Sequence, residues 1–133
     1  MNNQPTNQQE ASMNKTWNRN EINELLQRND IAVMRGIVRL FEMQTADESK
    51  VGRAKYKNNR GFGAADAKAG TRMARWLLGM NDRNEVRYPP KDLRHPLCQK
   101  ILGRYAHGDN VIDRARKIVM KHSAQLVEIA NRS

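Results

Sequence analysis

Residues 30–42 read DIAVMRGIVRLFE and carry the clearest helical pattern in this chain of 133 residues. On a wheel of about 100° per residue, the large apolar side chains fall on one broad face and the charged ones on the opposite face. The apolar members are Val33, Met34, Ile37, Val38, Leu40 and Phe41, and the charged members are Arg35, Arg39 and Glu42. This pattern predicts a core helix that begins after Asp30 and buries one side.

One further helix is expected before this one and another after it. Asn20 is a suitable N-cap for a short helix over about 21–27, because its side chain can accept a hydrogen bond from a free backbone N–H group. A third helix is expected from near Ala64 to Gly79, since glycine commonly ends a helix in the left-handed conformation. Residues 81–91 contain Pro89 and Pro90 and form a connector.

The C-terminal third predicts a fourth and a fifth helix. Pro96 suits the first turn of a helix that Gly108 ends, and Asn110 caps the last and longest helix. The core stripe of the last helix is Val111, Ala115, Ile118, His122, Leu126 and Ile129. No alternating strand pattern of useful length occurs, so we expect an all-α fold, a compact bundle of about four to five helices.

Composition divides the chain into a tail and one domain. Residues 1–15 are rich in Asn and Gln and nearly free of large apolar groups, so they predict a disordered polar tail. Residues 16–133 are long enough for a single helical domain with a modest core. The lone Cys98 excludes an internal disulfide and fits a reducing compartment. No stretch approaches the ~20 apolar residues of a membrane span, and we expect a soluble protein of the cytoplasm of a bacterial host.

The formal charge of +10 is unevenly distributed. Residues 1–44 are neutral, whereas residues 45–79 hold eight basic and three acidic side chains, a net charge of +5. Within residues 50–63, basic side chains alternate with aromatic ones and glycines, which predicts a long basic loop that can grip phosphates and stack on bases. The candidate binding residues of this loop are Lys50, Arg53, Lys55, Tyr56, Lys57 and Arg60.

Two helix faces extend this candidate surface. Lys68, Arg72 and Arg75 lie on one side of the third helix, with Asp66 as the only acid nearby, so that their mutual repulsion is uncompensated. On the last helix, Arg114, Lys117 and Lys121 share a face and have acidic residues within reach. Both rows are interpreted as phosphate contacts, with an ordinary solvated helix face as the alternative.

The glycines around Phe62 admit two interpretations. Gly61 and Gly63 could form a flexible entry to a helix N-terminus that accepts a phosphate, or they could merely permit a turn in which Phe62 anchors the core; the two roles can coexist. The core role is favoured for Phe62, because large aromatic residues are mostly buried. Residues 60–63 also match the opening of an RNA-recognition signature, but the strand residues that this signature requires are missing.

One family resemblance emerges from these residues. The run Arg60-Gly61-Phe62-Gly63-Ala64-Ala65-Asp66-Ala67, together with Ala115-Arg116-Lys117-Ile118 and Lys121-His122-Ser123-Ala124-Gln125-Leu126, resembles a small module of phage and plasmid proteins, some of which accompany helicase-like ATPases. The likeness covers about residues 45–130, and His122 stands where the family has tyrosine. The resemblance implies a mobile-element setting near DNA processing.

No enzyme class is supported by the sequence. The chain has no phosphate-binding loop of the ATPase type, and Glu48-Ser49-Lys50 lacks the strand and the partner acid of a nuclease motif. His95 and Cys98 are only two potential metal ligands, and His122 is interpreted as a packed core residue. A helix-turn-helix formed by the last two helices has poor spacing. We therefore expect no catalytic residue, no metal and no cofactor.

The sequence thus predicts a non-enzymatic nucleic-acid-binding accessory protein of a phage or mobile element, with DNA favoured over RNA and no membrane partner. The alternative is a phage-type inhibitor or adaptor that docks its basic face on a host defence or nuclease protein, or on another host or phage protein complex. Charge alone does not separate the two, because nucleic acids and acidic protein patches both attract Lys and Arg.

Overall fold

The computed structural model describes residues 16–51 and 61–132, with side chains described for 16–46 and 61–132. The described residues form six α-helices and one short 3-10 helix, and they contain no strand beyond an isolated bridge between Met80 and Val86. The elements are α2 (Arg19–Arg28), α3 (Asp30–Val51), α4 (Ala67–Leu78), α5 (Pro96–Leu102), η1 (Gly103–Tyr105), α6 (Val111–Lys121) and α7 (Ser123–Arg132). The all-α prediction is confirmed. The predicted tail over 1–15 and most of the basic loop lie outside the described residues.

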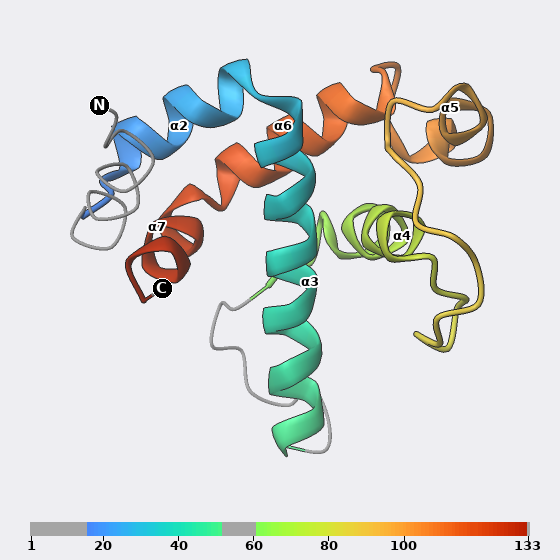
Figure 1. The fold of residues 1–133 in the computed structure, drawn as a ribbon, viewed down its shortest axis with the longest axis horizontal. Helices are drawn as coiled ribbons and strands as arrows, with labels where there is room; N and C mark the ends of the chain where they lie inside the picture. The colour runs from blue at the N-terminus through green and yellow to red at the C-terminus, as the bar shows by residue number, and fades with distance from the viewer. Residues whose placement is uncertain (1–15, 52–60, 133) are drawn as a thin grey trace, which may run out of the picture.

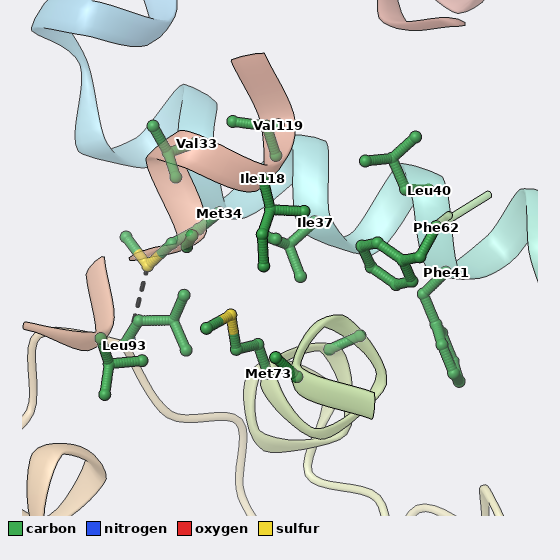
Figure 2. Close-up of a cluster of buried hydrophobic side chains, with 14 of the residues drawn as sticks. Val33, Met34, Ile37, Leu40, Phe41, Phe62, Met73, Leu93, Ile118 and Val119 are labelled. Carbon is green, nitrogen blue, oxygen red and sulfur yellow. Dashed lines mark hydrogen bonds between the residues drawn. The ribbon is translucent and has the colours of Figure 1, made fainter. Parts of the chain in front are cut away.

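Helix α3 forms the centre of the fold, as its apolar pattern predicts. It crosses α6 and packs against α4 and α7 (Figure 1). Ile37 of α3 is fully buried and points toward Ile118 of α6 and Met73 of α4 (Figure 2). Close packing of these side chains supplies the main apolar stabilisation of the domain. Met34 extends the same face, and its sulfur accepts a hydrogen bond from the backbone N–H of Leu93 at 3.5 Å.

Helix α2 begins two residues before the predicted position. Asn18, not Asn20, is the N-cap: its side chain accepts from the Glu21 N–H at 2.9 Å, and the Glu21 carboxylate accepts from the Asn18 N–H at 3.1 Å. This capping box gives acceptors to two backbone N–H groups at once. With Asn20 as the N-cap, Glu21 would be the first residue of the helix and could not form the capping box. The preceding Trp17 exchanges two backbone hydrogen bonds with the side chain of Asn131, at 2.7 and 3.0 Å.

Two other helix boundaries also differ from the prediction. The third helix begins at Ala67 and not near Ala64, because residues 64–66 form a turn that brings the buried Asp66 to the N-cap position. Helix α5 ends at Leu102 and continues as η1, so Gly108 lies several residues beyond its end. The predicted stop at Gly79 is confirmed, with a φ of 71°.

The predicted last helix is broken at His122 into α6 and α7. His122 has φ −105° and ψ 25°, which ends α6, and its side chain is only 14% exposed. Its imidazole does not face apolar neighbours alone, as the sequence interpretation held, because Nε2 lies against the Gly63 N–H and the Asp66 carboxylate. The continuous apolar stripe is therefore shared by two helices.

Candidate nucleic-acid interface

The basic row of α4 is exposed and lacks acidic partners. Ala69, Met73 and Ala74 face the core, and this orientation turns Lys68 and Arg72 toward solvent, with Arg75 half-buried. None of these three cations forms an ion pair with a carboxylate in the described ranges. Their positive charge is therefore not neutralised by the described part of the chain.

Neutral partners hold two of these cations in place. The guanidinium of Arg72 lies 5.0 Å from the centroid of the Tyr105 ring, and Arg75 Nε donates to the Asn84 side-chain oxygen at 2.8 Å. Both interactions orient the side chain without cancelling its charge. Arg72 and Arg75 are thus held in place with their positive charge retained.

The predicted row on the last helix is different, because each of its members meets a carboxylate. Lys117 pairs with Asp109 at 2.8 Å, and Arg114 and Lys121 both pair with Asp66 at 3.0 Å. Two carboxylates, Asp66 and Asp109, thus offset most but not all of the positive charge of these three cations. The α6 row therefore provides less attraction for a polyanion than the α4 row does.

Asp66 is the most deeply buried charged residue of this region. Its side chain is 1% exposed and makes no capping bond to α4; it accepts from Arg114 Nη2 and pairs with Lys121 Nζ. The Nε2 atom of His122 lies 3.5 Å from Oδ2 of the same carboxylate. A buried carboxylate requires such partners, because the loss of hydration is otherwise uncompensated.

The turn that precedes Asp66 packs on the junction of α6 and α7. The Gly61 N–H donates to Gln125 Oε1 at 2.7 Å, and Gln125 Nε2 donates to the Gly61 carbonyl at 2.9 Å. The Gly63 N–H donates to His122 Nε2 at 3.3 Å. Two of the three segments that carry the family resemblance, 60–67 and 121–126, are therefore in direct contact.

This arrangement confirms one of the two roles considered for the turn. Phe62 is 8% exposed and lies so close to Gly70 that a Cβ atom there would stand 2.4 Å from its ring. The core role of Phe62 is confirmed. The N–H groups of Gly61 and Gly63 already have acceptors, whereas Asp66 makes no side-chain capping bond to α4, so phosphate binding at the N-terminus of this helix stays a prediction.

A cavity of about 290 Å³ adjoins the α4 row. It lies between the C-terminal half of α4, the connector that follows and the end of α5, with Leu102 contributed by α5. The ammonium of Lys91 lies 5.0 Å from the centroid of the Trp76 ring and 5.9 Å from that of Tyr88. The complete lining is Arg72, Arg75, Trp76, Gly79, Met80, Asn81, Asp82, Tyr88, Lys91 and Leu102.

Backbone contacts fix the wall that the connector provides. The Gly79 carbonyl accepts from the N–H groups of Arg87 and Tyr88 at 2.8 and 2.9 Å. Gly79 is required here, because a Cβ atom would lie 1.9 Å from the Tyr88 carbonyl oxygen and because its φ is positive. The opposite wall is held by Trp76, whose Nε1 donates to the Asp92 carbonyl at 3.0 Å.

The segment after Lys91 is fixed by an ion pair. The Asp92 carboxylate accepts from the Arg94 guanidinium at 2.7 and 3.0 Å and from the Arg94 backbone N–H at 2.7 Å. These hydrogen bonds, chiefly the side-chain ones, lower the pKa of Asp92. The Asp92 carbonyl that accepts from Trp76 thus belongs to a well-tethered part of the connector.

Sequence analysis missed this cavity. Residues 81–91 were interpreted as a connector only, and Trp76 was given no role at a binding site. The available signal was the Tyr88-Pro89-Pro90-Lys91 run, in which an aromatic and a basic residue flank two prolines. Among the loop candidates, Lys50 lies within α3 and not in a loop, because this helix continues to Val51. Arg53, Lys55, Tyr56, Lys57 and Arg60 lie outside the described residues.

No protein-family profile, curated protein or solved structure matches this chain. Within the described ranges, no cluster of three His, Cys, Asp or Glu side chains is arranged to hold a metal ion. None of the described helices combines the length and apolar character needed to cross a membrane.

Proposed function

We propose that this protein is a non-enzymatic nucleic-acid-binding accessory protein of a phage or mobile element, with DNA as the favoured partner. The observation that carries the proposal is the contrast between the two basic rows. Lys68, Arg72 and Arg75 on α4 have no described acidic partner, whereas the row on α6 is paired.

The contrast matters because an uncompensated row costs stability in the free protein. Like charges at helical spacing repel by about 0.2–0.5 kcal/mol per pair. A row of phosphates converts this repulsion into attraction and releases the counterions condensed on the nucleic acid, which favours binding. Lys68 and Arg72 are exposed and Arg75 is half-buried on the same side of α4, so adjacent phosphates of one strand can meet successive cations.

The binding residues predicted from sequence over 50–60 are part of the same proposal. They are Lys50, Arg53, Lys55, Tyr56, Lys57 and Arg60. The mobile-element setting rests on the resemblance to phage and plasmid modules. Two of the three segments that carry it, 60–67 and 121–126, are in contact just before Lys68 at the start of α4.

The test is a comparison of two matched charge reversals. Binding of fluorescent single- and double-stranded DNA and of RNA is measured by anisotropy over a salt series, for the wild type and for Lys68→Glu/Arg72→Glu. The reversal should weaken binding to all sequences alike and lower the log–log salt slope by about 0.7–0.9 for each lost phosphate contact. The control is Arg35→Glu/Arg39→Glu on α3, which changes the net charge equally and should have little effect.

Two results would reject the proposal. If both double variants lose affinity equally, net charge and not the α4 row drives binding. If the wild type binds no nucleic acid at low salt, the inhibitor or adaptor that docks its basic face on an acidic protein patch becomes the leading function.

A further inference from the structure

The cavity beside α4 carries a strong charge preference. Arg72, Arg75 and Lys91 contribute three cations to its lining, and Asp82 contributes the only carboxylate among the lining residues. A cationic ligand is therefore disfavoured, although the aromatic walls alone would suit one. The charge selects a ligand that carries a negative group.

The aromatic walls add a second preference. The Lys91 ammonium lies over the rings of both Trp76 and Tyr88, so the faces of both rings are turned toward one point in the cavity. A planar group at that point can stack on an aromatic face once the flexible lysine side chain moves aside. Tyr88 is 54% exposed, which leaves the ring accessible from solvent.

Size adds a third. A volume of about 290 Å³ is at the low end of small-molecule sites, which span roughly 300–1,000 Å³. It suits a single planar base with an attached phosphate and excludes a folded peptide segment. A base within a duplex is stacked on both faces and cannot enter.

From these three properties we infer that the cavity receives one unstacked nucleotide of a single-stranded nucleic acid. The base stacks on Tyr88 and Trp76 in place of the Lys91 ammonium, which moves to the phosphate of the same nucleotide. Arg72 and Arg75 bind the neighbouring phosphates. This inference rests on the proposed function and makes it specific: the protein prefers single strands to duplexes.

The experiment compares a single strand and a duplex of equal length on the full chain. Tyr88→Ala should weaken single-strand binding by about 5- to 150-fold, which corresponds to the ~1–3 kcal/mol of one base–aromatic stack, and should leave duplex binding unchanged. Tyr88→Phe keeps the ring and should retain single-strand affinity. Ile31→Ala removes a comparably exposed apolar side chain from α3 and serves as the control.

A second readout follows Trp76 directly. Trp17 and Trp76 are the two tryptophans of the chain, so Trp17→Phe leaves Trp76 as the single reporter. Its fluorescence should be quenched by the single strand at the same concentrations at which anisotropy rises, and not by the duplex. Because Tyr88 contributes mainly its exposed ring, circular dichroism is expected to show that Tyr88→Ala remains folded.

The outcomes separate the two proposals. If single strand and duplex bind alike and Tyr88→Ala changes neither, the cavity inference is wrong and the phosphate-binding function stands. If no polymer binds but a nucleoside monophosphate quenches Trp76, the inference and the proposed function both fail, because the site then serves a free nucleotide.

Discussion

Replacement of Asp66 by asparagine is expected to be one of the most destabilising single changes in this domain. The amide keeps the size of the side chain and one acceptor oxygen but removes the negative charge. Asp66 is 1% exposed and Arg114 is 18% exposed, so the guanidinium would be left without a neutralising partner in a largely buried site.

The magnitude follows from the burial of each partner. Breaking a buried ion pair costs about 3–5 kcal/mol, and the partial exposure of Arg114 places Asp66→Asn near the lower value, about 3 kcal/mol. Lys121 is 55% exposed, so the loss of its pair with Asp66 adds less than about 1 kcal/mol. For a domain of this length the melting temperature should fall by roughly 10–15 °C.

Circular dichroism during thermal and urea unfolding measures this effect. Lys121→Met is the matched control, because it removes only the exposed partner and should shift the free energy of unfolding by less than about 1 kcal/mol. The double variant Asp66→Asn/Arg114→Met removes both buried charges and should recover part of the loss. An Asp66→Asn variant within about 1 kcal/mol of the wild type would refute the argument, and so would a double variant no more stable than the single one.

Three further predictions concern the rest of the fold. Gly79→Ala should destabilise by more than about 1 kcal/mol in urea unfolding and distort the cavity wall, because its φ of 71° and the Tyr88 carbonyl at 1.9 Å exclude a Cβ atom. Gln125→Ala should cost about 1–3 kcal/mol in the same assay, since it leaves the N–H and carbonyl groups of Gly61 unpaired; an unchanged midpoint would contradict this. Burial raises the pKa of the Cys98 thiol from 9.0 to about 12, so a disulfide reagent at pH 8 should label it only as fast as the protein unfolds. The free energy of unfolding should also decrease as the pH rises from about 9 to 12, because over this range the thiol loses its proton in the unfolded chain but keeps it in the folded one.

The elements that were predictable from sequence depend on local patterns. The apolar face of α3, the end of α4 at Gly79 and the burial of Phe62 follow from helical periodicity, from the backbone freedom of glycine and from the general burial of aromatic side chains. Each of these signals lies within a few residues of the feature that it predicts.

The features that sequence analysis missed depend on contacts between distant residues. No glycine or proline marks the break at His122, where the turn at 61–63 meets the α6–α7 junction. Arg114 was interpreted as a phosphate contact, and its observed partner Asp66 is 48 positions away in the sequence. The cavity likewise combines a ring from α4 with a ring from the connector, and no periodic pattern links the two.

The hydrogen bonds between Trp17 and Asn131 affect how the domain is assembled during synthesis. The two residues are 114 positions apart, and α2 packs against α6 and α7. The chain leaves the ribosome from its N-terminus, so α2 emerges first among the described helices. Helix α7, which covers part of α2, is the last of these helices to be synthesised. The part of α2 that packs against α7 must therefore stay exposed until α7 has left the ribosome, whereas the part that packs against α3 can be covered earlier.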